Sequence, residues 1–292
     1  MNKKLGFGLA IASYMLWGVL SLYWHLLAQV NSLEVFSYRI LSTMLTMLLY
    51  FLLTKKMSKL SGEIRQLMTS KKATLSMLTA ALLIATNWLT YIYMIATKQA
   101  TAASLGYYVM PILSVLLAVV FLREKISRWT LVAIIFAFLG VLLLTFEQGH
   151  LPVLTLVLAL SFGFYGLLKK NVKLSSDVSI TLETVIIMPF VLIFLVFFAQ
   201  HGFWNYSFAD QIYLAFSGII TAIPLLLFAE SLKHAQLNTV GFLQYVNPTL
   251  QLLIALFVFK ESLSASGFQS LLLILLSIVI FVIGQVKGLL TK

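Results

Sequence analysis

Long apolar runs recur along the whole chain and constrain its fold more than any other feature. Each holds about twenty residues, enough to cross roughly 30 Å of hydrocarbon as an α-helix. Lipid offers no partner to a bare backbone amide, so each run is expected to be helical. The chain is 61% hydrophobic, more than is usual for a soluble globular protein. The sequence therefore predicts an all-α polytopic membrane protein.

Ten of these runs are predicted to be transmembrane helices. They cover residues 5–28, 33–53, 73–95, 102–122, 129–146, 151–168, 178–199, 210–230, 238–259 and 266–287. The longest connection, 54–72, is basic, and we expect either a surface helix or a solvated connector there. The first run has no small-residue processing site and is followed by many more spans, which argues against a cleaved signal peptide.

Lysine and arginine are divided unevenly between the two sides of the predicted topology. With a cytoplasmic N-terminal end, seventeen of the 20 basic residues face the cytoplasm, whereas Lys98 and Lys260 face outward and Arg39 lies within a span. Cytoplasmic loops are enriched in these residues, so both termini are expected to be cytoplasmic. The net charge of +11 thus follows from short basic loops, and no aromatic-studded basic face for a nucleic acid is present.

One apolar stretch of the chain occurs twice. The first copy contains Pro111 and ends in Glu124, and the second contains Pro248 and ends in Glu261. Both pairs are 137 positions apart (248 minus 111, and 261 minus 124). The copies lie in the fourth and ninth spans, an odd number of crossings apart, so they enter the membrane in opposite senses.

The duplication predicts two inverted five-helix repeats, residues 1–148 and 149–292. A fainter similarity between residues 13–18 and 161–166 agrees with this division. Inverted repeats are typical of alternating-access transporters, whose substrate site lies between the halves near the midplane of the membrane.

Polar and aromatic side chains within the spans are the candidates for lining such a site. Amides are costly in lipid, so they should face other helices or a wet cavity. Simple interhelical contacts are the alternative, and Trp24, near a span end, is expected to be an interfacial anchor. The candidate cavity residues are Tyr14, Trp17, Ser21, Asn87, Trp88, Tyr91, Ser104, Tyr107, Tyr108, Tyr165, Gln244, Tyr245 and Gln251. Rings, amides and hydroxyls suit a mildly polar organic molecule better than a bare inorganic ion.

Pro111 and Pro248 are predicted to lie inside helices and to act as hinges. A proline there removes one amide donor and leaves the carbonyl four residues earlier, of Tyr107 or Gln244, without its usual partner. A tolerated kink is the alternative, but the matched placement in both repeats favours a mechanical role.

Three charged residues within the spans are functional candidates. Arg39 lies deep enough in its span to need a partner or water. We interpret Glu34 and Arg39 as a structural or gating pair, although a spacing of five residues is not ideal for one. The alternative is proton coupling through Glu34 or Glu183, since Glu183 roughly corresponds to Glu34 in the second repeat.

The sequence lacks the motifs of several enzyme classes and metal sites. The chain has no cysteine, which excludes disulfides, thiolate ligands and cysteine nucleophiles. The 4 histidines show no metal-ligand spacing, and no nucleophile elbow, zinc-protease helix, phosphate-binding loop or dinucleotide fingerprint is present. We therefore expect no metal, no cofactor and no enzymatic activity.

The sequence resembles the RarD family over essentially its whole length. This family belongs to the EamA group of the drug/metabolite transporter superfamily. Besides the ten spans in two inverted halves, the resemblance rests on the run Ser104-Leu105-Gly106-Tyr107, the pair Asn87-Trp88, and Gln244-Tyr245 followed by Pro248. Family members are bacterial inner-membrane proteins regarded as carriers of small metabolites or drugs, and the family carries a chloramphenicol-sensitivity label. The resemblance implies a multi-pass location in that membrane and a transport function, without specifying a substrate.

Together these features predict a secondary transporter, and specifically an exporter, that moves a small organic metabolite or drug by alternating access. Without a nucleotide site, the energy would come from the substrate's own gradient or from protons. The alternatives are a passive channel, a non-transporting membrane scaffold and a membrane-embedded enzyme. The enzyme would need acid and base residues clustered at one membrane face, and the sequence shows no such cluster.

Overall fold

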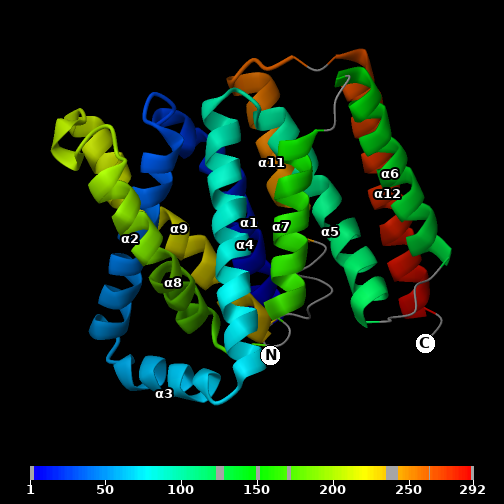
Figure 1. Cartoon of the computed structure of the whole chain (residues 1–292). Coiled ribbons are helices and arrows are strands. Elements are labelled where there is room, and N and C mark those ends of the chain that lie inside the picture. The colour runs from blue at the N-terminus through cyan, green and yellow to red at the C-terminus, as the bar shows by residue number, and fades with distance from the viewer. Residues whose placement is uncertain are drawn as a thin grey trace.

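The computed structural model describes residues 3–122, 128–148, 152–169, 172–234, 243–262 and 264–290 as a bundle of long helices (Figure 1). The helices are α1 (Lys3–Leu26), α2 (Ser32–Leu53), α3 (Met57–Met68), α4 (Lys71–Ala96), α5 (Ala100–Leu122), α6 (Arg128–Gln148), α7 (Val153–Lys169), α8 (Ser176–Phe197), α9 (Phe208–His234), α11 (Val246–Leu253) and α12 (Ala265–Leu290). A short 3₁₀ helix, η1 (Phe203–Asn205), precedes α9, and a π-helix, η2 (Ile254–Val258), continues α11.

Nine of the ten predicted spans each correspond to one described helix: α1, α2, α4, α5, α6, α7, α8, α9 and α12. Within the described residues, 6 helices are long and apolar enough to cross a membrane: α1, α2, α4, α8, α9 and α12. The multi-pass, all-helical character is thereby confirmed, and the count of ten spans stays a prediction. In Figure 1, α1 begins and α12 ends at the same, lower end of the bundle.

The ninth predicted span, 238–259, is not one continuous helix. Its first part, up to residue 242, lies outside the described residues, and residues 244 and 245 form a turn. Helix α11 starts only at Val246 and passes directly into the π-helix η2.

Pro248 consequently lies in the first turn of α11 rather than in a helix interior. Amides in a first turn have no intrahelical partner, so a proline is tolerated there. The Gln244 carbonyl accepts a hydrogen bond from the Asn247 amide at 3.2 Å. This carbonyl thus lacks its usual donor, the amide that Pro248 does not have, and is paired with the Asn247 amide instead. Pro111 lies within α5, and its side chain is outside the described residues.

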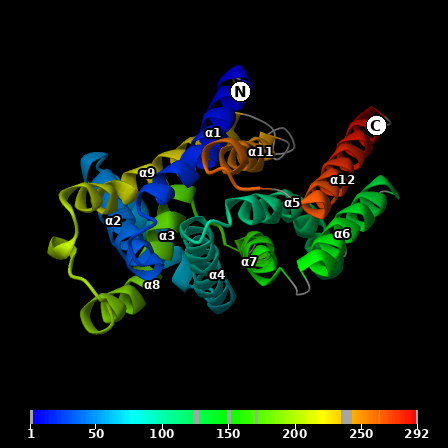
Figure 2. The same cartoon turned by 90° about the horizontal axis from the view of Figure 1, so that it is seen from above.

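Eight elements form a closed ring, in which helices from the first and second halves of the chain alternate (Figure 2). The order around the ring is α1, α9, α2, α8, α4, α7, α5 and α11, and α11 returns to α1. Helices α6 and α12 lie outside the ring and pack mainly against each other. Exchanging α1 with α7, α2 with α8, α4 with α9 and α5 with α11 leaves every neighbour relation in the ring unchanged.

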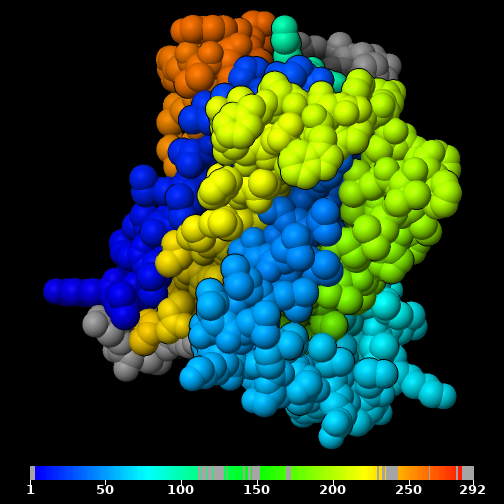
Figure 3. All heavy atoms as spheres, turned by 90° about the vertical axis from the view of Figure 1, so that its left-hand side faces the viewer, coloured from blue at the N-terminus to red at the C-terminus, as the bar shows by residue number. Residues whose placement is uncertain are grey.

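Small residues allow the ring helices to approach one another closely. At the contact of α2 with α9, the Ser42 hydroxyl donates to the Ala215 carbonyl and accepts from the Gly218 amide, the latter at 3.0 Å. A Cβ on Gly218 would overlap the Ser42 backbone. Figure 3 shows the two helices lying against each other, α9 in yellow and α2 in blue. Packing and hydrogen bonds at small residues are what hold helices together in lipid.

Helix α5 starts at the upper end of the ring in Figure 1, and Glu261, which follows η2, contacts that start. Its two carboxylate oxygens accept hydrogen bonds from the amides of Ala100 and Thr101, both at 2.8 Å. These are the first two residues of α5, where amides are unpaired and the helix dipole favours a negative charge. Glu261 thereby ties the end of the α11–η2 segment to the start of α5.

The basic connection at 54–72 contains α3, which lies across the lower end of the bundle (Figure 1). Leu60 and Leu67 of α3 are buried. The Lys59 ammonium lies 2.7 Å from an Asp177 carboxylate oxygen, and Glu63 accepts a hydrogen bond from the Ser175 amide at 2.7 Å. The surface-helix alternative is therefore the one found, and α3 is tethered to the start of α8.

Replacing Asp177 by asparagine is expected to loosen α3. The Lys59 side chain is 38% exposed, so the ion pair contributes up to about 1 kcal/mol and is screened by salt. Limited proteolysis within α3 should rise severalfold in Asp177→Asn while the thermal transition of the bundle moves little. Lys59→Met should give the same increase, and the double variant should add nothing further. Additive effects of the two substitutions would show that the pair does not hold α3.

Candidate functional site

A cavity of about 220 Å³ lies within the ring. Every ring helix contributes at least one side chain to its wall, and Gln244 contributes from the turn before α11. The lining residues are Tyr14, Trp17, Leu20, Trp24, Arg39, Ile84, Asn87, Trp88, Tyr91, Tyr107, Met110, Phe162, Tyr165, Glu183, Thr221, Leu225, Phe228, Gln244, Asn247 and Gln251. The wall is thus mostly aromatic and aliphatic, with a few amides and two charged groups, a composition typical of sites for small organic ligands.

Most of the residues singled out from the sequence meet at this cavity. They are Tyr14, Trp17, Asn87, Trp88, Tyr91, Tyr107, Tyr165, Gln244 and Gln251, together with Arg39 and Glu183. Their sequence positions span both halves of the chain, so only the closed ring brings them together.

Four of the candidate cavity residues lie elsewhere. The hydroxyls of Ser21 and Ser104 donate to the carbonyls of Gly18 (3.4 Å) and Pro248 (2.8 Å), which makes them contacts within or between helices. The Tyr108 hydroxyl lies 2.8 Å from the Thr249 hydroxyl, at the contact of α5 with α11. Tyr245 lines a separate apolar hollow between α11 and α12.

Several lining residues were missed, although the internal repeat marks them. Thr221, Leu225 and Phe228 of α9 stand 137 positions after Ile84, Trp88 and Tyr91 of α4 (for example, 228 minus 91). Asn247 stands at the same interval after Met110. Each member of these pairs lines the cavity. Trp88 and Tyr91 are sequence candidates, so applying the interval to them would have found Leu225 and Phe228.

The predicted ion pair of Glu34 with Arg39 is not formed. Glu34 is buried, and its carboxylate accepts hydrogen bonds from the backbone amides of Gln200 (2.5 Å) and His201 (3.3 Å) and from the Tyr206 hydroxyl. Burial and, after it, the hydrogen bond to Glu34 raise the pKa of Tyr206 above its ordinary range. The phenol therefore stays protonated and donates a hydrogen bond to the carboxylate. Glu34 therefore anchors the α8–α9 connection and does not face the cavity.

Arg39 faces inward instead. It is 4% exposed, and its Nε donates to the Thr221 hydroxyl of α9 at 3.1 Å. The carbon of its guanidinium lies 4.5 Å from the ring centroid of Trp88 and 4.8 Å from that of Trp24. Guanidinium groups at such distances from aromatic faces are attracted by the ring quadrupole.

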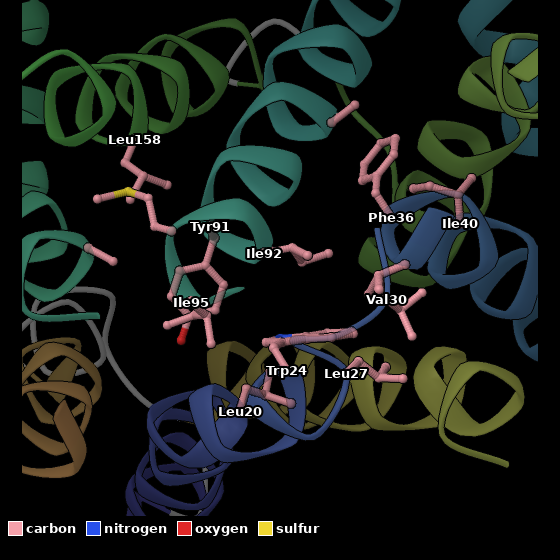
Figure 4. Close-up of a cluster of buried hydrophobic side chains, with 14 of the residues drawn as sticks. Leu20, Trp24, Leu27, Val30, Phe36, Ile40, Tyr91, Ile92, Ile95 and Leu158 are labelled. Atoms are coloured by element: carbon pink, nitrogen blue, oxygen red, sulfur yellow. The ribbon is translucent and has the colours of Figure 1, made fainter. Parts of the chain in front are cut away.

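Trp24 was expected to be an interfacial anchor, and this is wrong. The residue is 2% exposed and belongs both to the largest buried apolar cluster and to the cavity wall. Figure 4 shows its ring beneath Ile92, with the indole nitrogen on the side toward Tyr91. Its position near the end of α1 suggests contact with the membrane surface, but the surrounding helices bury it.

The amide side chains at the cavity differ in how they are engaged. Asn87 is buried, donates to the Leu158 carbonyl at 2.8 Å and the Ser161 hydroxyl at 3.1 Å, and accepts from Tyr107 at 3.3 Å. It therefore joins α4 to α7 and α5. Gln244 makes no side-chain hydrogen bond to any residue that the structure describes. Its amide is available to a molecule in the cavity.

Glu183 brings a second charge to the wall, from α8. It is 2% exposed, and its Oε1 accepts from the Tyr165 hydroxyl at 2.9 Å and the Ser179 hydroxyl at 3.2 Å. Among the described residues, no group of three or more histidine, aspartate or glutamate side chains could hold a metal ion.

Comparison with known proteins places this arrangement in a family. The pattern of the EamA-like transporter family matches residues 4–146 and, a second time, residues 152–283. The chain belongs to the EamA-like transporter family. Within it, "Uncharacterized transporter YojE" of Bacillus subtilis (strain 168) is 38% identical over 287 residues, which are 98% of this chain and 96% of that protein. "Protein RarD" of Escherichia coli (strain K12) is 30% identical over 289 residues, 98% of this chain and 96% of that one.

The fold of this EamA-like chain also occurs among solved structures. One crystal structure, 15% identical in sequence, superposes with a TM-score of 0.64 and covers 98% of this chain and 100% of its own. The resemblance to RarD proteins drawn from the sequence is confirmed. With its apolar helices, the EamA-like protein is a multi-pass protein of the bacterial inner membrane.

Proposed function

We propose that this protein is a secondary transporter that exports a small organic metabolite or drug across the inner membrane by alternating access. The observation that carries the proposal is the cavity enclosed by a ring in which the two halves of the chain alternate. A site at the interface of two repeats can be exposed to either side when one repeat moves relative to the other.

Several contacts support two inverted repeats, residues 1–148 and 149–292. The family pattern matches twice, and α1 and α7 run in opposite directions in Figure 1. Ser13 donates to the Pro224 carbonyl at 2.7 Å, and Asn87 donates to Ser161 at 3.1 Å. These contacts are counterparts, because Pro224 is 137 positions after Asn87 and Ser161 aligns with Ser13. The α1–α9 and α4–α7 contacts are thus built alike.

The transport cycle requires the ring to open at one end while it stays closed at the other. Glu261 ties the end of the α11–η2 segment to the start of α5, and we assign this end of the ring to the outside from the distribution of Lys and Arg and treat the contact as the outer closure. The substrate's own gradient drives export, or protons do so through Glu183, the buried carboxylate on the wall.

A passive channel, a scaffold and an enzyme are the competing functions, and counterflow separates them. Purified protein is first screened by thermal shift against amino acids, nucleosides, aromatic metabolites and antibiotics. A stabilising compound is then followed into sealed proteoliposomes preloaded with the same unlabelled compound. Uptake accelerated by the preload indicates a carrier. Uptake without acceleration indicates a channel, and the absence of uptake with chemical conversion of the compound indicates an enzyme.

Gln244→Ala is expected to reduce this counterflow by about tenfold or more while leaving the protein inserted and folded. The amide lines the cavity and supports no described contact, so its removal should change the unfolding free energy by less than about 0.5 kcal/mol. Gln269→Ala, at an exposed position of α12, is the matched control and should transport normally. Normal transport by Gln244→Ala would show that the Gln244 side chain is not part of the substrate site.

A further inference from the structure

Arg39 is the cationic group of the cavity wall, and it lacks an anionic partner there. No carboxylate of the described residues lies within 4.0 Å of its guanidinium. Among the described residues, the Arg39 side chain makes one hydrogen bond, from Nε to the Thr221 hydroxyl. Its two terminal nitrogens therefore have no acceptor among these residues. A buried charge within a membrane is expensive unless it is compensated, and such residues line substrate or ion pathways.

The surroundings of Arg39 hold the guanidinium in place rather than neutralise it. Trp88 and Trp24 contact it through their rings, and Thr221 fixes its Nε. A side chain immobilised in this way keeps its planar pair of terminal donors in one orientation. Planar, bidentate donors match the geometry of a carboxylate.

A second donor in the same wall also lacks a partner. The indole Nε1 of Trp24 is buried and makes no hydrogen bond to any described residue. Buried N–H groups are nearly always paired, so an unpaired one in the cavity wall is a candidate donor to a bound molecule. Thus two neighbouring side chains present donors, and both lack an acceptor.

The acid in the cavity does not fill this role. Glu183 accepts hydrogen bonds from Tyr165 and Ser179 and lies beyond ion-pair distance of Arg39. A cationic substrate would have to enter beside the guanidinium, where like charges repel at low dielectric. A substrate with a single negative charge would balance the Arg39 guanidinium locally, whereas a dianion would leave one negative charge beside it uncompensated.

We propose that the cavity selects a small organic monocarboxylate with an aromatic or branched apolar body, and that Arg39 is its anchor. The carboxylate accepts from the terminal nitrogens of Arg39, with the Trp24 indole N–H as a further donor. The body occupies the apolar part of the wall, where the rings of Tyr14, Trp17 and Phe228 lie 5.6–6.0 Å apart. This assignment rests on the proposed transport function and names its substrate class.

The test uses matched compounds that differ only in charge. Wild-type protein in nanodiscs is titrated calorimetrically near neutral pH with phenylacetate, phenylacetamide and 2-phenylethylamine. The acid, amide and amine of a branched aliphatic chain (isovalerate, isovaleramide and isoamylamine) and of indole (indole-3-acetate, indole-3-acetamide and tryptamine) complete the panel. A lost charge-assisted hydrogen bond should weaken binding at least about tenfold. We therefore expect at least one acid to bind tenfold or more tightly than its amide, and its amine to bind more weakly still.

The preference should depend on Arg39. Arg39→Gln should bind the acid and the amide equally, and Arg39→Lys should keep part of the preference, because it retains the charge without the planar fork. Arg65→Gln, the same change at an exposed arginine of α3, should bind like wild type. If Arg39→Gln does not fold, the comparison of acid with amide in the wild-type protein still tests whether the cavity prefers a carboxylate.

The proposal is overturned if no acid in the panel binds better than its amide, if an amine binds best, or if chloride or phosphate competes as strongly as the acids do. Counterflow of the best-binding acid is measured separately. Binding with the predicted preference but without counterflow would overturn the transport function and leave the Arg39 anchor standing. Counterflow of a neutral or cationic compound, but not of the acids, would support the transport function and overturn the Arg39 anchor.

Discussion

Gly218→Ala is expected to prevent normal assembly of the bundle. The added methyl group would overlap the Ser42 backbone, and backbone cannot rotate away as a flexible side chain can. Overpacking in a tight contact costs about 1–3 kcal/mol, and here it would also break the hydrogen bond from the Gly218 amide to the Ser42 hydroxyl. The yield of folded protein in detergent should fall severalfold, and the thermal transition of the remainder should move down by several degrees.

Gly166→Ala is the matched control for this prediction. Gly166 lies within α7, and a Cβ there would meet nothing within 4 Å. Alanine is favoured over glycine in helices by about 0.8–1.0 kcal/mol, so this variant should be as stable as wild type or slightly more so. Equal stability of the two variants would show that α2 and α9 are not held at the distance described.

Glu261→Gln is expected to loosen the end of the ring that we assign to the outside. Glutamine cannot present two anionic oxygens to the Ala100 and Thr101 amides, and it loses the attraction to the start of α5. A capping interaction of this kind contributes about 1–2 kcal/mol. The population of molecules open to the outside should therefore increase about tenfold.

The absence of cysteine makes this shift measurable. A single cysteine replacing Leu20, which lines the cavity, can be labelled with a membrane-impermeant thiol reagent from the outside. Labelling should be about tenfold faster in Glu261→Gln than in the parent. Glu230→Gln is the matched control, because it makes the same change in the last turns of α9, away from the Glu261 contact. It should not accelerate labelling. An unchanged labelling rate in Glu261→Gln would show that this carboxylate is not part of the closure.

The fold could be predicted well because its main determinants are local or repetitive. Apolar runs gave the helices, and the interval between Pro111 and Pro248 indicated the duplication. The same interval relates lining residues such as Tyr107 and Gln244. What could not be predicted was the order of helices around the ring, because alternation of the halves arises from contacts between residues more than a hundred positions apart.

Errors at the site have the same origin. Glu34 and Arg39 were paired because they lie close in sequence, yet each finds its partner in the second half, at Gln200 and Thr221 respectively. Trp24 was assigned to the membrane surface from its place in α1, and the buried cluster there depends on α4, which no pattern within α1 can reveal.

Alternation around the ring also has a consequence for biosynthesis. Helix α11 is the last ring member to leave the ribosome, and it fills the gap between α1 and α5. Until it emerges, the ring lacks one of its eight members and the cavity lacks the wall residues Gln244, Asn247 and Gln251. Maturation of the binding chamber is therefore a late, single event in translation, and a ribosome that stops before residue 246 leaves the chamber open.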